Sequence, residues 1–126
     1  MITFHGVTKD YDGHIALNHL DLTIEDGQIV GLIGHNGAGK STTIKSLVSV
    51  ITPTTGSIEV DGQDLYNHRL AIKKKIGYVA DSPDLFLRLT ANEFWELVAT
   101  SYDMSQKDCD QRLEELLTIF DFQSHR

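Results

Sequence analysis

One short stretch of this chain combines the groups that bind an anionic phosphate chain. Residues 34–42 are Gly-His-Asn-Gly-Ala-Gly-Lys-Ser-Thr, which fits the pattern G-x-x-x-x-G-K-[ST]. Glycines let backbone N–H groups converge on an anion, because no Cβ blocks the approach. Lys40 supplies a positive charge for β- and γ-phosphates, and the Ser41 hydroxyl is a ligand for Mg²⁺. The alternative is a glycine-rich strand-to-helix turn, and the neighbouring sequence decides between the two.

The segments on both sides predict the elements that a phosphate-binding loop needs. Residues 29–33 form an apolar run that is typical of a parallel strand covered on both faces. After the loop, apolar residues recur at helical spacing and predict a helix that Pro53 and Gly56 end. These residues are Ile44, Leu47, Val48 and Ile51. A helix that begins at the loop directs its unpaired N–H groups at the phosphates, so the sequence favours a true phosphate-binding loop.

The chain changes character along its length, from mixed strands and helices to helices only. Alternating residues predict strands at 2–8, 19–25 and 57–60, a short helix at 67–75 and a buried strand at 76–80. The turns Asp12-Gly13 and Asp26-Gly27 separate the first elements.

Two helices are predicted after residue 89. Thr90 and Glu93 have the spacing of a capping box, and Ser105 and Asp108 resemble a weaker cap. The apolar faces of the two helices would consist of Ala91, Phe94, Trp95 and Val98, and of Leu113, Leu116, Leu117 and Phe120.

Composition and charge argue against several classes of protein. The 126 residues carry a formal net charge of −7, which argues against nucleic acid as a partner, because binding to a phosphate backbone depends on clustered Lys and Arg. The first residues lack the basic and apolar regions of a signal peptide. No apolar run approaches the roughly 20 residues that cross a bilayer. We therefore expect a soluble, cytoplasmic polypeptide.

Three further features, together with the loop, resemble the ATP-binding subunit of an ABC transporter. Tyr11 opens the stretch 11–17, Tyr-Asp-Gly-His-Ile-Ala-Leu, which resembles the aromatic A-loop of that family. Residues 53–58 match its P-T-x-G-x-[IV] pattern and are followed by Asp-Gly. Residues 76–79, Ile-Gly-Tyr-Val, are similar to the segment that leads into its Q-loop. The resemblance covers residues 2 to about 100.

The resemblance implies an α/β fold, with a P-loop NTPase core, a β-rich edge subdomain and the start of an α-helical subdomain. Residues 1–89 would form the ATP-binding core, with the A-loop, Walker A and Q-loop regions, and residues 90–126 would begin the helical subdomain. The rest of such a domain would be absent from these 126 residues.

The resemblance also implies ATP and Mg²⁺ as cofactors. Tyr11 would stack on adenine, although an ordinary turn aromatic remains an alternative. Ser41 and Asp81 would be the metal ligands. The triphosphate would be held by the Walker A residues Gly34, His35, Asn36, Gly37, Ala38, Gly39, Lys40, Ser41 and Thr42, with His35 contributing only backbone.

Asp81 is a departure from the family pattern. It stands where the family generally has a Gln that ligates Mg²⁺ and senses the γ-phosphate. Carboxylates are good ligands for hard cations, but Asp is shorter than Gln and adds negative charge near the phosphates. A turn residue beside Pro83 is the alternative for this position.

The second departure is that no L-S-G-G-Q signature, Walker B Asp-Glu pair or switch His occurs in the chain. We expect these 126 residues to bind ATP without turnover and to contain no catalytic residue, although Lys40 supports phosphoryl transfer in a complete subunit. In the family the Walker B strand lies between the strands expected at 29–33 and 76–80. The chain alone should therefore show a gap in the sheet there, or borrow a strand from another chain.

The resemblance implies two partners, a transmembrane permease and a second ATP-binding subunit that forms a dimer. The protein would lie at the inner face of the cell membrane through its partners. Leu85, Phe86, Leu87 and Leu89 would receive the permease, unless they pack in the core under the helical lobe. A soluble ABC ATPase without a transport role and a nucleotide-binding regulatory module that never hydrolyses ATP are the alternative functions.

Overall fold

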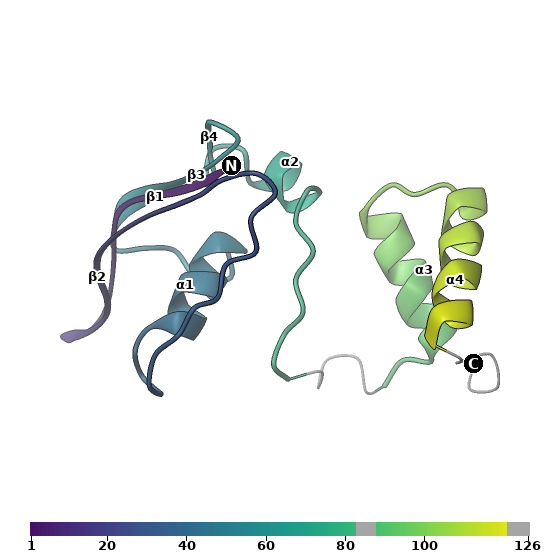
Figure 1. The fold of residues 1–126 in the computed structure, drawn as a ribbon, viewed down its shortest axis with the longest axis horizontal. Coiled ribbons are helices and arrows are strands. Elements are labelled where there is room, and N and C mark those ends of the chain that lie inside the picture. Colours follow the sequence, from purple (N-terminus) through teal and green to yellow (C-terminus); the bar gives the residue numbers. More distant parts are fainter. Residues whose placement is uncertain (83–87, 121–126) are drawn as a thin grey trace. The chain divides into compact units, whose positions relative to one another are not determined.

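The structure, a computed structural model, describes residues 1–82 and 88–120. They fall into two compact units, Met1–Tyr78 and Val79–Arg126, and each is described by itself. The first unit contains a β-sheet with short helices, and the second contains two helices (Figure 1). This mixed architecture, with an antiparallel β-subdomain, confirms the predicted α/β class.

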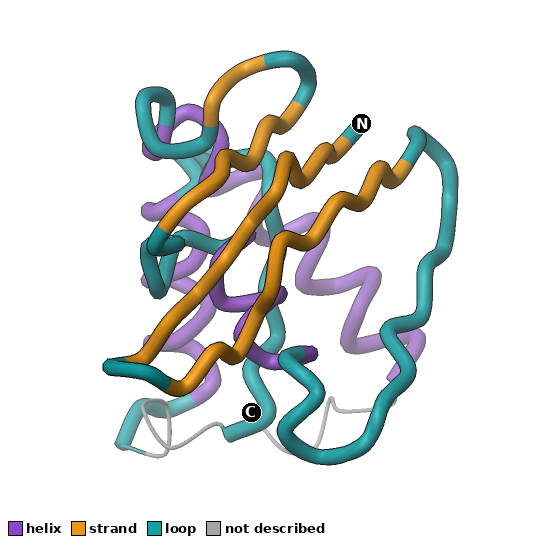
Figure 2. Tube along the Cα trace, turned by 90° about the vertical axis from the view of Figure 1, so that its left-hand side faces the viewer, coloured by secondary structure: helices purple, strands orange, loops and turns teal. Residues whose placement is uncertain are grey.

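The sheet of the first unit has four antiparallel strands in the order β2-β1-β3-β4 (Figure 2). The strands are β1 (Ile2–Tyr11), β2 (His14–Ile24), β3 (Thr55–Val60) and β4 (Gln63–Asp64). The three predicted strands near these positions are confirmed, and each is longer than predicted. Asp12 and Gly13 form the tight turn between β1 and β2, both with positive φ. The Asp10 carboxylate accepts a hydrogen bond from the Gly13 N–H at 2.7 Å and so closes this turn.

The core of the first unit lies between the sheet and its helices. Two helices, α1 (Lys40–Leu47) and α2 (Arg69–Lys73), bring Leu47 and Ile72 to this core. A β-bulge between Phe4 and Val7 lets both side chains point into the core, although they are three residues apart. The fully buried side chains include Phe4, Val7, Ile58, Leu65 and Ile72.

Two predicted strands are wrong. Residues 29–33 and 76–80 have no regular secondary structure, and Ile29, Ile33 and Val79 are almost fully exposed. A strand needs a neighbour that accepts and donates backbone hydrogen bonds, and among the described residues none pairs with either segment. The expected gap presupposed two buried strands at these segments, and because neither strand forms, the sheet consists only of β2-β1-β3-β4 and does not test that expectation.

Helix α1 is shorter than its apolar pattern predicts. It ends at Leu47, because Ser49 adopts a positive φ and the N–H groups of Val50 and Ile51 turn back to the Lys45 carbonyl. Its buried side chains are Thr43 and Ser46, whereas Ile44 is exposed. The predicted face of α1 is therefore wrong in part.

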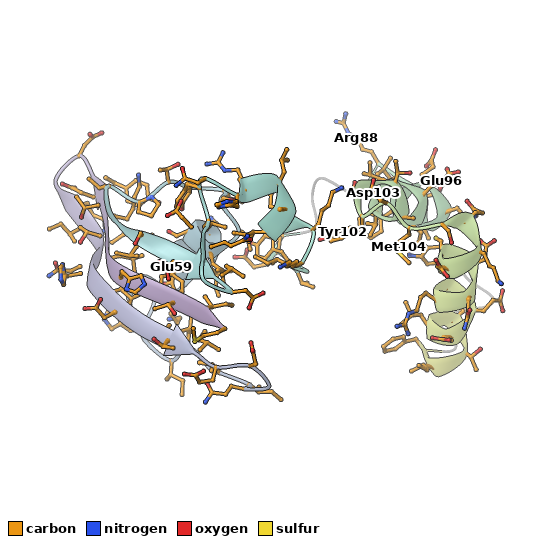
Figure 3. All side chains as sticks on the ribbon, turned by 90° about the horizontal axis from the view of Figure 1, so that it is seen from above. Glu59, Arg88, Glu96, Tyr102, Asp103 and Met104 are labelled. Carbon is orange, nitrogen blue, oxygen red and sulfur yellow. The ribbon has the colours of Figure 1, made fainter. Side chains whose placement is uncertain are left out.

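The second unit contains the two predicted helices, α3 (Ala91–Ser101) and α4 (Gln106–Phe120). The capping box is present, since the Thr90 hydroxyl accepts from the Glu93 N–H and the Glu93 carboxylate accepts from the Thr90 N–H. Ser105 caps α4 by accepting from the Asp108 N–H at 3.1 Å. Figure 3 labels Tyr102, Asp103 and Met104 in the connection between the helices. Both predicted caps are confirmed.

The apolar faces of the second unit are confirmed for α3 and only in part for α4. The predicted residues of α3 are half-buried, and Leu113 and Leu117 of α4 also point inward. Leu116 and Phe120 are exposed, because no element of the described unit packs on that side of α4. Within residues 1–82 and 88–120, no helix is long and apolar enough to cross a membrane.

Candidate functional site

The phosphate-binding loop and the β1–β2 hairpin enclose one cavity. Its volume is about 280 Å³. Tyr11, at the end of β1, lines this cavity together with the start of α1. Two segments that are far apart in the sequence therefore meet at one place in the first unit. The described residues that line the cavity are Tyr11, His14, Ala16, Asn36, Gly37, Gly39, Lys40, Ser41 and Thr42.

The backbone of Gly39 fixes the loop against the hairpin. Gly39 has φ of 90° and stands at the N-cap of α1. A Cβ at this position would lie 2.4 Å from the Ala16 carbonyl oxygen and 2.9 Å from the Leu17 side chain. Only glycine fits both the conformation and the space, and this explains the second invariant glycine of the pattern. The loop therefore rests directly on β2.

The first turn of α1 can receive an anion. Gly39 offers no side chain to cap the helix, and no acidic residue occurs in the first turn. The N–H groups of that turn have no partner within the helix, and they carry the positive end of the helix dipole. Ser41 and Thr42 line the cavity at this point, so their backbone and hydroxyl groups are available to a bound phosphate.

The Lys40 ammonium folds back over the loop. It donates hydrogen bonds to the Gly34 carbonyl oxygen and, at 2.7 Å, to the His35 carbonyl oxygen. The loop is closed further by the Ala38 N–H, which donates to the same His35 carbonyl. The His35 ring lies 2.8 Å from the carbonyl oxygen of the adjacent Asn36, measured from Nδ1. Lys40 is thus held at the cavity by neutral carbonyl groups and keeps its charge available for an anion.

Among the residues that the structure describes, no carboxylate lines the cavity, although the chain has a net charge of −7. Lys40 and the start of α1 make this place electropositive. An acidic protein that keeps its acidic groups out of one cavity favours an anionic ligand there.

Two lining residues were not predicted from the sequence. Ala16 and His14 belong to β2 and contribute to the hairpin side of the cavity. His14 stands directly opposite Tyr11 in the strand register. The hairpin turn at Asp12-Gly13 was the available signal, because residues that flank a tight turn are cross-strand neighbours. Gly34, His35 and Ala38, which were also predicted to bind the ligand, are not among the described lining residues, and their backbone contributes to the part of the loop that holds Lys40.

The metal site predicted at Ser41 and Asp81 is not tested by the structure. Ser41 lines the cavity, whereas Asp81 is exposed and belongs to the other compact unit. Among residues 1–82 and 88–120, no group of three or more His, Cys, Asp or Glu side chains could hold a metal ion. A hydroxyl ligand with phosphate oxygens and water would still suit Mg²⁺, which is held in many sites by few protein groups. Leu85, Phe86 and Leu87 of the predicted docking patch lie outside the described residues, and Leu89 is exposed.

Known proteins share both the sequence and the fold of this chain. The ATP-binding protein EcsA of an ABC-type transporter from Bacillus subtilis is 36% identical over 120 residues, which cover 95% of this chain and 49% of EcsA. The bacitracin transport ATP-binding protein BcrA from Bacillus licheniformis is 33% identical, over 93% of this chain and 37% of BcrA. The chain therefore spans half or less of the length of these relatives.

Solved structures agree with this result. A structure of the ATP-binding subunit of an ABC transporter matches with a TM-score of 0.84 at 30% identity, over 94% of this chain and 49% of that one. The post-hydrolysis dimer of the ATP-binding cassette MJ0796, bound to ADP and Pi, matches with a TM-score of 0.80 at 29% identity, over 94% of this chain and 56% of that one. The family model described as "ABC transporter" matches residues 17–126. This chain belongs to the ABC transporter ATP-binding family.

Proposed function

We propose that the cavity between the hairpin and the loop binds ATP. The observation that carries this proposal is that Tyr11 and the phosphate-binding loop line one cavity, to which residues 1–82 and 88–120 contribute no carboxylate. Lys40 and the first-turn N–H groups of α1 would hold the phosphates, and Tyr11 would stack on adenine. Relatives whose names describe them as ATP-binding support this ligand. Mg²⁺, with Ser41 as one ligand, would neutralise phosphate charge in the complex.

Lys40 provides the direct test. In Lys40→Ala, the charge-assisted contacts to the β- and γ-phosphates are lost, and ATP should bind about tenfold to a hundredfold more weakly. Lys40→Arg should restore little, because a planar guanidinium replaces a compact ammonium within the same loop. Lys45→Ala is the matched control, since Lys45 lies on α1 and does not line the cavity. Calorimetric titration with ATP measures all four proteins, and unchanged affinity in Lys40→Ala would overturn the proposal.

The metal role of Asp81 is a separate part of the proposal. If Asp81 ligates Mg²⁺, then Asp81→Ala should weaken binding of Mg²⁺-ATP more than binding of metal-free ATP, because a carboxylate attracts the metal and repels the phosphates. Titrations with and without Mg²⁺ measure the two losses. Equal losses would make Asp81 a turn residue only.

We further propose that the full-length protein is the ATPase subunit of an ABC transporter and couples ATP binding and hydrolysis to transport. Its partners would be a transmembrane permease and a second ATP-binding subunit, and it would lie at the cytoplasmic face of the cell membrane through the permease. A related cassette that was solved as a dimer supports the second partner. Co-purification of the protein with membranes that contain the permease tests this assembly, and a protein found only in the soluble fraction would favour an ABC ATPase without a transport role.

A further inference from the structure

A lysine lies over the ring of the tyrosine that lines the cavity. Lys9 and Tyr11 are two residues apart on β1, and the Lys9 ammonium nitrogen lies 4.9 Å from the centre of the Tyr11 ring. This distance falls within the range of about 6 Å in which a cation is attracted to an aromatic face. Lys9 is half-buried, and in the described part of the chain no carboxylate forms an ion pair with it. The aromatic ring is therefore the partner of this charge.

Of this pair, only Tyr11 belongs to the described lining of the cavity. We propose that Lys9 supports the Tyr11 ring from outside the cavity, so that the other face of the ring is free to receive a nucleotide base. Lys9 is thus a positioning residue that acts through Tyr11. This inference rests on the proposed binding of ATP.

The ring needs such support because little else restrains it. Tyr11 is 45% exposed and ends its strand beside the tight turn at residues 12 and 13. An exposed ring exchanges between rotamers, and a ligand that stacks on it must then spend part of its binding free energy on fixing one of them. A cation held on one face favours a single orientation before the ligand arrives. Preorganisation of this kind strengthens binding of the base without any contact between Lys9 and the nucleotide.

A comparison of two ligands separates this role from simple attraction of charge. ATP contains the base and the phosphates, whereas inorganic tripolyphosphate contains only the phosphates. Lys9→Gln removes the charge and keeps most of the side-chain stem. It should weaken ATP binding about two- to fivefold and leave tripolyphosphate binding unchanged. Lys9→Arg should keep the wild-type affinity for ATP, because a guanidinium also stacks on aromatic rings.

A double-mutant cycle in the full-length protein completes the test. In a Tyr11→Leu background, Lys9→Gln should cause no further loss of ATP affinity, because the ring through which it acts is gone. Lys73→Gln, which makes the same change of charge on α2, is the control and should bind both ligands normally. Thermal unfolding of each variant verifies that the fold is retained.

The possible outcomes test the positioning role of Lys9 separately from the proposed binding of ATP. A loss of tripolyphosphate binding in Lys9→Gln, or an undiminished effect in the Tyr11→Leu background, would show long-range attraction and overturn the positioning role. A loss in Tyr11→Leu without any loss in Lys9→Gln would also overturn it, while ATP binding through Tyr11 stands. Unchanged ATP affinity in Tyr11→Leu would instead remove the base-stacking part of the proposed function.

Discussion

Two apolar stretches of the first unit differ in burial: one lies in the core, and the other is exposed to solvent. On β1, Phe4 and Val7 are 2% and 0% exposed, whereas Ile29 and Ile33 in the segment before the phosphate-binding loop are 103% and 98% exposed. Both stretches are rich in residues that favour strands. They differ in their neighbours, because β1 pairs with β2 on one side and β3 on the other, and no described residue pairs with 29–33. In this chain a strand therefore forms where a partner strand satisfies its backbone, and apolar sequence alone is insufficient.

The difference also shows how the candidate site is held. The loop has a firm contact on its hairpin side, where Gly39 lies against Ala16, and α1 follows it directly. The segment that leads into the loop has no comparable packing. The position of the phosphate-binding groups thus depends on the hairpin and on α1, and we expect substitutions there to have larger effects than substitutions at 29–33.

The largest expected effect is on stability. Phe4→Ala removes a buried aromatic side chain from the core and should lower the free energy of unfolding by about 3–5 kcal/mol. Ile33→Ala removes an exposed side chain and should change it by no more than about 0.5 kcal/mol. Urea denaturation followed by circular dichroism measures both. A large loss in Ile33→Ala would show that the segment 29–33 is buried in solution and would break the comparison.

A smaller effect is expected where the loop rests on the hairpin. Gly39→Ala forces a positive φ on a residue with a Cβ and places that Cβ 2.4 Å from the Ala16 carbonyl oxygen. It should cost about 2–3 kcal/mol and also weaken ATP binding, since the loop must move. Gly37→Ala is the matched control, because Gly37 has a similar φ of 87° and no atom within 4 Å of the added Cβ.

The control should show only the cost of the conformation, about 1 kcal/mol. Thermal unfolding of the two variants measures this difference in stability, because Gly37 itself lines the cavity and its substitution also bears on ATP binding. Equal losses in Gly39→Ala and Gly37→Ala would mean that the contact with the hairpin does not hold the loop.

Sequence reasoning succeeded where the signal is local and failed where it depends on a distant partner. The tight turn at Asp12-Gly13, the caps at Thr90 and Ser105, and the loop that opens α1 are each set by residues within a few positions. Strand pairing for 29–33 and 76–80 requires a neighbour from elsewhere, and the apolar pattern contains no information on whether one is present. His14 was missed because the loop pattern does not extend to the hairpin that faces it.

The early end of α1 has a different cause. The helix ends just before Ser49, which has a positive φ. Gly or Asn usually occupies this conformation at a helix end, and because Ser49 is neither, the sequence did not predict an end here. Tyr66 then secures the end of the helix, since its hydroxyl lies 3.1 Å from the Ser46 carbonyl oxygen and 3.2 Å from that of Ile51. A tyrosine that is distant in the sequence gives no local signal of this role.

The cap of α3 tests a local signal in the second unit. Thr90→Ala removes the hydroxyl that accepts from the Glu93 N–H and should destabilise α3 by about 1 kcal/mol. Thr90→Ser keeps the hydroxyl and should be nearly neutral. Hydrogen exchange of the α3 amides measures the local effect, and equal exchange in Thr90→Ala and Thr90→Ser would show that the cap contributes nothing.

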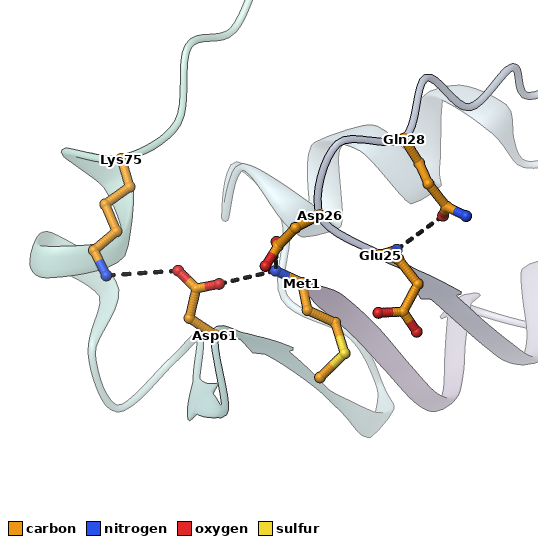
Figure 4. Close-up of polar contacts among 6 residues, drawn as sticks. All are labelled: Met1, Glu25, Asp26, Gln28, Asp61 and Lys75. Atoms are coloured by element: carbon orange, nitrogen blue, oxygen red, sulfur yellow. Dashed lines mark hydrogen bonds and ion pairs between the residues drawn. The ribbon is translucent and has the colours of Figure 1, made fainter.

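The smallest expected effect concerns the end of the sheet from which both exposed segments leave (Figure 4). The Met1 ammonium donates to the carboxylates of Asp26 and, at 2.9 Å, Asp61, and Asp61 also lies 3.7 Å from the Lys75 ammonium. Asp26 precedes the segment 29–33, and Lys75 precedes 76–80. This cluster therefore holds the chain in place just before the exposed segments 29–33 and 76–80.

The charges of this cluster predict a dependence of stability on pH. Hydrogen bonds with Asp26 and Asp61 raise the pKa of the Met1 ammonium, so its contribution is complete below about pH 8 and is lost as the pH rises through the raised value. The hydrogen bond from Met1 lowers the pKa of the Asp61 carboxyl, so its contribution is present above about pH 4 and is lost as the pH falls through the lowered value. All of these groups are exposed, and we expect a small effect that added salt reduces further.

The difference in thermal midpoint between wild type and Asp61→Asn tests this dependence. It should be largest between about pH 5 and 8 and should shrink on both sides of this range. Lys75→Gln is the control, because it removes the weaker partner of Asp61 and leaves Met1 in place, so the decrease above pH 8 should persist. A difference that stays constant from pH 3 to pH 10 would mean that Asp61 acts through the geometry of its turn, where its φ is positive, and that its charge does not anchor the exposed segments.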